Sequence, residues 1–333
     1  MAPHAPSAKR SFLFAAVVVT AFFGVLEAGL RMVGVKRRPV GTRLILRAID
    51  TDIDLPFMRA DPDLFWAPKP GYRGEFQGQP VTINSLGLRG PEPRERRGAR
   101  RVLCLGDSIT FGYGVGDDHT YPASLERRLA GQGIEVVNGG VTGYTSHQAS
   151  RLLAQIGPAL RPDVVTACIG WNDATLRHAT DREYARRLRW AQRTARLADH
   201  MFLYRAMSNL YARNLAPAPA AARDTPRVPP DEYRANLAAI ARDARALGAR
   251  VAFIGLPHRS GPGEPAPDLT YPRLLAETAA ALGVPLLDVG VLAWDASPDG
   301  NEALFIDPLH LSPEGAAEMA RRIAEHAAAA GVL

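Results

Sequence analysis

Cysteine is nearly absent from this chain of 333 residues, which contains only Cys104 and Cys168. Both lie inside apolar runs, so we expect buried side chains and no disulfide framework. The sequence also lacks C-x-x-C and H-E-x-x-H spacings, a P-loop, and a G-x-G-x-x-G segment between a strand and a helix. These absences argue against a metal site and a nucleotide, and we expect that the protein needs no cofactor.

Aromatic residues are also few, at 7% of the chain. The net charge is +6. A basic protein can bind nucleic acid or an anionic membrane surface. Here the basic residues are mostly arginines scattered through alanine-rich segments, and no motif combines basic and aromatic residues. We therefore expect no nucleic-acid partner.

From residue 100 onward, short apolar runs alternate with amphipathic stretches. Strands are expected at 102–105, 134–137, 164–169, 251–256 and 284–287. This alternation predicts a parallel sheet with helices on both faces, which is a three-layer α/β/α fold. With 47% hydrophobic residues the chain can bury a sizeable core, and about 230 residues suffice for one such domain.

Residues 11–30 form an apolar stretch that only Glu27 interrupts, and twenty residues can span the core of a bilayer. We predict an uncleaved transmembrane anchor, because no A-x-A-like cleavage site follows. A cleaved signal segment and a soluble helix are the alternatives. More basic residues follow the stretch than precede it, and this bias favours a cytoplasmic location for the main domain.

The amino-acid composition of the remaining segments suggests where one part of the chain ends and the next begins. Residues 1–10 are expected to be a tail, and 31–98, rich in proline, glycine and charge, a juxtamembrane linker or cap with a strand at 81–83. The α/β domain is expected at 99–333. Within it, 174–230 is too long for a simple crossover, so we predict a helical insert.

The insert has an apolar stripe at helical spacing. An ordinary helix packed on the domain explains this stripe, and a substrate lid or a membrane-surface helix is the alternative. Residues 216–230 are expected to form a flexible linker. The stripe consists of Leu197, Met201, Tyr204, Met207, Tyr211 and Leu215.

The first expected strand ends at Gly106-Asp107-Ser108. Open α/β sheets bind ligands just beyond the carboxyl ends of their strands, so Ser108 is placed where chemistry usually happens. A serine hydroxyl is a weak nucleophile and needs a base within hydrogen-bond reach, together with a group that orients the base. Ser108 is therefore a candidate nucleophile.

The carboxyl-terminal region supplies a candidate base and its partner. In Asp307-Pro308-Leu309-His310 the carboxylate lies three residues before the imidazole, close enough to orient it within one turn. His310 would lie just before a helix that begins near residue 312. His258, which follows the strand at 251–256, is a rival base, but the neighbouring sequence offers it no carboxylate.

Acyl transfer also needs hydrogen-bond donors directed at the developing oxyanion. Gly143 follows the second strand and can bring its backbone N–H close to a ligand, although Gly140 is an alternative match. Asn172 follows the third strand, and its amide can donate without carrying charge. Trp171, beside it, is a candidate for lining the substrate pocket, with a packing role as the alternative.

The series G-D-S, G, G-x-N-D and D-x-x-H, in this order, resembles the SGNH (GDSL) hydrolase family over about residues 100–330. The resemblance implies a flavodoxin-like sheet and a triad of Ser108, His310 and Asp307. It also implies an oxyanion hole formed by Ser108, Gly143 and Asn172. The G-x-S-x-G elbow of α/β-hydrolases is absent, because Gly106-Asp107-Ser108-Ile109-Thr110 lacks the second glycine.

We therefore predict a membrane-anchored serine esterase that acts through an acyl-enzyme. The resemblance to anchored bacterial members implies an extracytoplasmic domain, against the local charge bias, and short acyl groups on carbohydrate or envelope polymers. The alternatives are acyl transfer to a surface polysaccharide, a lipase-like activity on lipid esters, and a non-catalytic glycan-binding protein. The sequence predicts neither the acyl length nor the oligomeric state.

Overall fold

A computed structural model of the chain describes residues 8–34, 55–95, 98–198, 201–203, 206, 224–258, 268–289 and 304–333. The side chains of the first helix are described from residue 12, and those of the helix that begins at residue 181 as far as residue 189.

A five-stranded sheet forms the centre of the molecule, and its strands are all parallel, in the order β11-β10-β7-β5-β6. Every residue of β6 and β7 is buried, because helices cover both faces. The flavodoxin-like α/β/α fold predicted from the sequence is confirmed. The strands are β5 (Arg100–Gly106), β6 (Ile134–Gly140), β7 (Val164–Cys168), β10 (Arg250–Ile254) and β11 (Leu286–Leu287).

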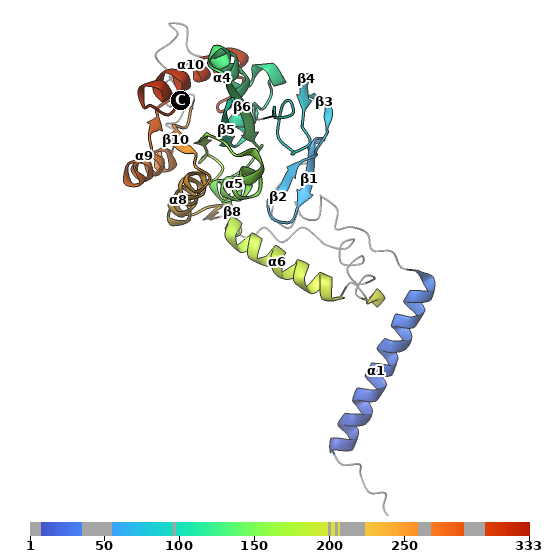
Figure 1. The fold of residues 1–333 in the computed structure, drawn as a ribbon. Coiled ribbons are helices and arrows are strands. Elements are labelled where there is room, and N and C mark those ends of the chain that lie inside the picture. Colours follow the sequence, from blue (N-terminus) through green and yellow to red (C-terminus); the bar gives the residue numbers. More distant parts are fainter. Residues whose placement is uncertain are drawn as a thin grey trace, which may run out of the picture.

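Two groups of helices cover the sheet (Figure 1). The helices α4 (Tyr121–Leu129) and α10 (Pro313–Ala329) pack together on one face. The other face carries α5 (Ser146–Leu160), α8 (Pro230–Ala246) and α9 (Thr270–Leu282), where α8 packs against both α5 and α9. Two short 3₁₀ turns flank α4, namely η1 (Asp117–His119) and η2 (Ala130–Gln132).

The strand order changes direction at β5, because β6 lies on one side of it and β7 on the other. The helices that follow two such neighbouring strands lie on opposite faces, which leaves a crevice at the carboxyl ends of the strands. Ser108 follows β5 and Asn172 follows β7, so both residues lie at this crevice.

Residues 55–95 contain two antiparallel hairpins that lie beside the central sheet (Figure 1). Their apolar side chains, including Phe57, Trp66 and Leu88, belong to the same buried core as the sheet. Arg89 forms a bridge with Asn138 on the edge strand β6, so this region protects the sheet edge. The hairpin strands are β1 (Met58–Asp61), β2 (Phe65–Pro68), β3 (Arg73–Phe76) and β4 (Gln79–Thr82).

The segment expected to be an insert leaves and re-enters the domain at one place. Its first strand, β8 (Leu176–Arg177), pairs antiparallel with β9 (Thr225–Pro226). Between them, α6 (Asp181–Ala198) extends away from the domain (Figure 1). In the expected apolar stripe, the side chain of Met201 is described and exposed. The other five stripe side chains, and residues 216–223 of the expected linker, lie outside the described parts.

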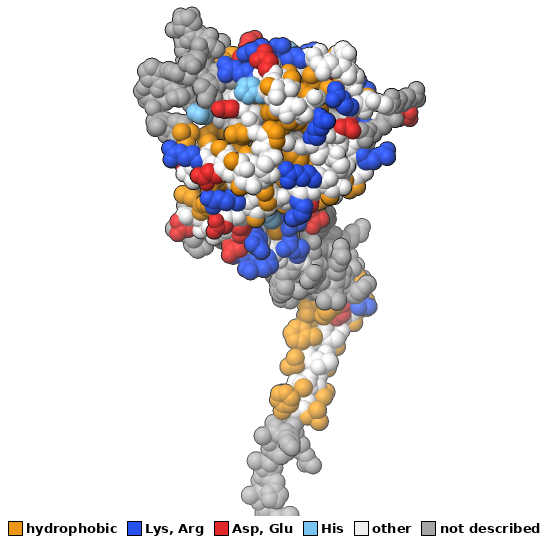
Figure 2. Space-filling model, turned by 60° about the vertical axis from the view of Figure 1, so that its left-hand side comes forward, with side chains coloured by type: hydrophobic (Ala, Val, Ile, Leu, Met, Phe, Trp, Pro, Cys, Tyr) orange, Lys and Arg blue, Asp and Glu red, His pale blue; other side chains and the backbone are white. Residues whose placement is uncertain are grey.

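The amino-terminal helix α1 (Ala8–Val33) projects from the body, with apolar side chains along its length (Figure 2). Its segment Phe12–Val33 has a mean hydropathy of 2.2 and is long and apolar enough to cross a membrane. Glu27, which interrupts the apolar stretch, accepts hydrogen bonds from the backbone N–H groups of Phe202 (2.8 Å) and Leu203 (2.7 Å). The end of α1 therefore contacts the segment that follows α6.

Candidate active site

The turn after β5 presents Ser108 as the first residue of a short helix, α3 (Ser108–Phe111). Asp107 caps this helix, because its Oδ1 accepts the N–H of Ile109 at 3.0 Å. The helix ends at Gly112, which has the left-handed φ of 84° that favours glycine. Gly106 lets the turn pack closely on the sheet, since a Cβ there would lie 2.6 Å from the Cys168 carbonyl oxygen.

A second tight turn, just before α10, holds Asp307 and His310. The Asp307 Oδ1 accepts the backbone N–H groups of Leu309 and His310, each at 2.8 Å. The Ile306 N–H donates to the His310 carbonyl oxygen at 2.9 Å and closes the turn. As expected from the sequence, a helix begins directly afterwards, with Ser312 as its N-cap.

These two turns bring Ser108, His310 and Asp307 into one hydrogen-bonded chain. The His310 Nε2 lies 2.9 Å from the Ser108 Oγ, and the His310 Nδ1 lies 2.7 Å from the Asp307 Oδ2. A carboxylate can only accept, so Nδ1 carries the proton and Nε2 is free to accept the proton of Ser108. Ser108 and His310 are 202 residues apart in the sequence, and the fold brings them together.

The surroundings of the two ionisable members favour a charged Asp307. Partial burial would raise the pKa of Asp307, but hydrogen bonds from the His310 ring and from the N–H groups of His310 and Leu309 outweigh it and lower the pKa. The Tyr113 ring lies against the His310 ring, with 4.5 Å between the ring centroids. Tyr113 therefore limits how far the imidazole can turn from Ser108.

Gly140 and Gly143, the two alternative oxyanion residues, have different surroundings. The Gly140 N–H donates to the Asn138 Oδ1 at 2.9 Å, so it is already engaged. Gly143 lies in the turn after β6 with a φ of 78°. Within the described ranges, its N–H has no hydrogen-bond acceptor, whereas its carbonyl oxygen accepts from Arg227.

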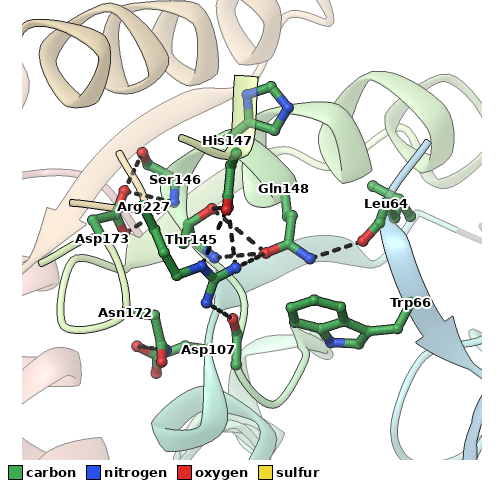
Figure 3. A network of polar contacts seen from close by, with 12 residues as sticks. Leu64, Trp66, Asp107, Thr145, Ser146, His147, Gln148, Asn172, Asp173 and Arg227 are labelled. Carbon is green, nitrogen blue, oxygen red and sulfur yellow. Dashed lines mark hydrogen bonds and ion pairs between the residues drawn. The ribbon is translucent and has the colours of Figure 1, made fainter. Parts of the chain in front are cut away.

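Asn172 lies beside the nucleophile turn. Its Nδ2 is 3.4 Å from the Asp107 Oδ2, and this contact holds the amide beside the residue that precedes Ser108 (Figure 3). Because Nδ2 carries two hydrogens, the other remains free to donate elsewhere. Asp107 is almost completely buried, and this burial raises the pKa of its carboxyl to about 7.

Trp171 and His258 lie together. The Trp171 indole donates to the Pro257 carbonyl oxygen at 3.2 Å, and its ring meets the His258 ring edge to face at 5.9 Å. The His258 Nδ1 lies 3.3 Å from the Leu256 carbonyl oxygen. In the described structure His310 is the histidine that reaches Ser108.

Sequence reasoning missed three side chains that support these turns. Arg89 is buried and donates to the carbonyl oxygens of Phe111 (2.7 Å), Gly112 (2.6 Å) and Val115 (2.6 Å) behind the nucleophile helix. Trp66 and Arg227 hold the turn that contains Gly143. Their contacts join distant parts of the chain, so no local pattern could reveal them.

A serine, an unprotonated imidazole nitrogen and an oriented carboxylate at these distances can perform nucleophilic acyl transfer. The hydroxyl can attack a carbonyl carbon while the imidazole takes its proton. An amide donor at the nucleophile turn, such as the Asn172 side chain, can stabilise the negative oxygen that develops.

Comparison with known proteins identifies the same part of the chain. A model of the "GDSL-like Lipase/Acylhydrolase family" matches residues 104–318, from β5 to α10. An arylesterase from Vibrio mimicus is 32% identical over 77 residues, which are 22% of this chain and 38% of the arylesterase. The chain therefore matches well under half the length of this curated relative.

Two solved structures illustrate the structural similarity. A lipase/acylhydrolase from Enterococcus faecalis is 20% identical and has a TM-score of 0.47, over 69% of this chain and 96% of that chain. The psychrotrophic esterase EstA from a Pseudoalteromonas species is 16% identical and has a TM-score of 0.46, over 69% of this chain and 97% of that chain.

Proposed function

Because the chain belongs to the GDSL-like lipase and acylhydrolase family, as its motifs predicted, we propose that it cleaves carboxylic esters through an acyl-enzyme on Ser108. The observation that carries this proposal is the hydrogen-bonded chain from the Ser108 Oγ through His310 to Asp307, with distances of 2.9 and 2.7 Å. The family establishes the class of enzyme, and this geometry supports the assignment of each residue.

In the first half-reaction the Ser108 Oγ attacks the ester carbonyl carbon while the His310 Nε2 takes the hydroxyl proton. The charge on the imidazolium is stabilised by Asp307, whose lowered pKa keeps it ionised at neutral pH. The C–O bond to the alcohol then breaks, and His310 returns the proton to the leaving oxygen. The products are a free alcohol and an ester between the acyl group and Ser108.

In the second half-reaction water replaces the alcohol. His310 takes a proton from the water, the hydroxide attacks the acyl carbon, and the Ser108 Oγ leaves with the proton that His310 holds. Both half-reactions pass through a tetrahedral oxyanion. We assign its stabilisation to the N–H groups of Ser108 and Gly143 and to the Asn172 amide. Gly143 is preferred over Gly140, because the Gly140 N–H is engaged by Asn138.

For the substrate we propose short acyl esters on carbohydrate or envelope polymers. This substrate proposal extends what the sequence resemblance implies. We further propose that α1 anchors the protein in a membrane and that the catalytic domain is extracytoplasmic. An alkaline phosphatase fused to the carboxyl terminus should then be active. If that fusion is inactive, and a reporter enzyme that works only in the cytoplasm is active at the same position, this topology is refuted.

The esterase proposal is tested with the full-length chain in detergent and p-nitrophenyl esters of increasing acyl length. Ser108→Ala and His310→Ala should each abolish nearly all turnover, and a fluorophosphonate should label Ser108 alone. Ser150→Ala serves as the matched control, because among the described residues the Ser150 hydroxyl bonds within its own helix turn, to the His147 carbonyl oxygen at 3.1 Å. Full activity in Ser108→Ala would refute the mechanism.

A further inference from the structure

The peptide between Thr142 and Gly143 is held from one side by Trp66. The Trp66 Nε1 donates to the Thr142 carbonyl oxygen at 2.9 Å. In a trans peptide the C=O and the N–H that follows it lie in one plane and point in opposite directions. Since the Thr142 oxygen faces Trp66, the Gly143 N–H faces away from it.

The next peptide is held by Arg227, whose Nη1 donates to the Gly143 carbonyl oxygen at 2.8 Å. Arg227 is itself fixed, because it is buried and paired with the buried Asp181 at 3.0 Å. Its Nη2 also donates to the Gln148 Oε1 at 2.9 Å. Both carbonyl groups next to the Gly143 α-carbon are therefore engaged by buried side chains.

The two supports contact each other. The Arg227 guanidinium lies over the Trp66 ring, 5.5 Å from the ring centroid. Gln148 connects them further, because its Nε2 donates to the Leu64 carbonyl oxygen on the hairpin that carries Trp66, at 2.8 Å. Figure 3 shows Arg227 and Gln148 pointing toward each other, with Trp66 beside Gln148.

The hydrogen bonds from Trp66 and Arg227 matter because the residue between the two carbonyl groups is a glycine. Gly143 has a φ of 78°, and a glycine populates such backbone conformations about as readily as those with negative φ. Without external contacts its peptides could turn at little cost. A hydrogen bond on each adjoining carbonyl oxygen selects one orientation before substrate arrives, and oxyanion stabilisation depends on such preorganised donors.

We propose that Trp66 is a positioning residue, which together with Arg227 fixes the Thr142–Gly143 peptide so that the Gly143 N–H points at the reacting carbonyl oxygen. This inference rests on the proposed esterase function. It assigns to the hairpin of β1 and β2, which precedes the matched family region, an effect on transition-state stabilisation that acts through the Gly143 N–H.

The test is Trp66→Phe, which keeps an aromatic ring but removes the indole N–H. Loss of one oxyanion donor costs about 100- to 1,000-fold in kcat, so a donor that is present but poorly oriented should cost about 10- to 100-fold. KM for the same p-nitrophenyl ester should change less than about threefold, because the contact acts on the transition state. Binding of a boronic acid, which forms a tetrahedral adduct with serine, should weaken by a factor similar to the loss in kcat/KM.

Tyr144→Phe is the matched control. The Tyr144 hydroxyl donates to the Trp66 backbone carbonyl oxygen at 2.9 Å, so this variant loses one buried hydrogen bond to Trp66 but leaves the indole N–H in place. Its kcat should stay within about threefold of the wild type. If Trp66→Phe fails to fold, Arg227→Lys is the second variant. It keeps the positive charge opposite Asp181 but removes the guanidinium N–H donors, and it should show the same selective loss of kcat.

The outcomes separate the two proposals. An active wild type with a folded, fully active Trp66→Phe variant would overturn this inference and leave the esterase function intact. An equal loss in Tyr144→Phe would also overturn it, because a general loss of packing would then explain the effect. A wild type that neither hydrolyses esters nor reacts with fluorophosphonate would overturn the proposed function and this inference with it.

Discussion

Replacement of Asp307 with asparagine should almost abolish turnover, and the reason is the proton on His310. The Asp307 Oδ1 accepts two backbone N–H groups at 2.8 Å each, so an asparagine would keep its oxygen there. Its amide nitrogen would then replace the Oδ2 that lies 2.7 Å from the His310 Nδ1. An amide nitrogen only donates, so Nδ1 must lose its proton, which moves to Nε2. A protonated Nε2 cannot accept the Ser108 proton.

A wrong histidine tautomer of this kind lowers kcat by about 10,000-fold in Ser-His-Asp enzymes, which corresponds to about 5 kcal/mol of transition-state stabilisation. Asp307→Ala should lose less, about 100- to 1,000-fold. The Asp307 side chain is 39% exposed, so water can replace it and accept the Nδ1 proton. The assay is steady-state hydrolysis of one p-nitrophenyl ester by the wild type and both variants.

Asp268→Asn is the matched control, because the Asp268 Oδ1 accepts the Thr270 N–H at 2.9 Å in a similar local turn. It should leave kcat unchanged. If Asp307→Asn keeps more than about a tenth of wild-type kcat, or is more active than Asp307→Ala, the tautomer argument is refuted.

Three further substitutions test the surroundings of the nucleophile turn. Arg89→Met should lower the free energy of unfolding by about 3–5 kcal/mol in urea, because it leaves Asp117, 3.0 Å from the Arg89 Nε, without its buried partner; a loss below about 1 kcal/mol would contradict this. Burial raises the pKa of Asp107 from 3.8 to about 7. Between those values this carboxyl therefore lowers the free energy of unfolding by about 1.4 kcal/mol for each unit by which the pH rises. Asp107→Asn, which keeps a helix cap, should therefore gain stability over the wild type as the pH rises from 5 to 7, and a constant difference would refute that pKa. Gly106→Ala should lower the melting temperature and kcat together, since its Cβ would lie 2.6 Å from the rigid Cys168 carbonyl oxygen; an unchanged melting temperature would show that the turn can move.

The sheet could be predicted from sequence because each strand is a short apolar run that ends at glycine or polar residues. The expected strand at 102–105 lies inside β5, and the expected strand at 134–137 lies inside β6. The expected strand at 164–169 extends one residue beyond β7, and β10 ends two residues before residue 256. Such ends depend on cross-strand pairing, which an apolar pattern does not encode.

The triad was predicted for a different reason. The Asp307 and His310 pair is local, and its spacing within one turn is visible in the sequence. The structure places this pair against Ser108, and their functional roles stay a proposal. The supports were not predicted, because Trp66 and Thr142 are 76 residues apart and Arg227 and Gly143 are 84 residues apart. No periodicity connects residues at such separations.

The position of these supports bears on where the catalytic unit begins. Residues 31–98 were predicted to be a linker or cap outside a domain at 99–333. Yet Trp66 contacts the Gly143 turn, and Arg89 donates to carbonyl oxygens behind Ser108. A chain cut at residue 99 would keep the whole triad but remove the Trp66 and Arg89 donors from these carbonyl oxygens, which is costly because buried polar groups that lose a partner are not compensated by water. We therefore expect the smallest unit with a complete site to begin before Phe57, whose ring stacks on Phe111 of the nucleophile helix at 5.1 Å.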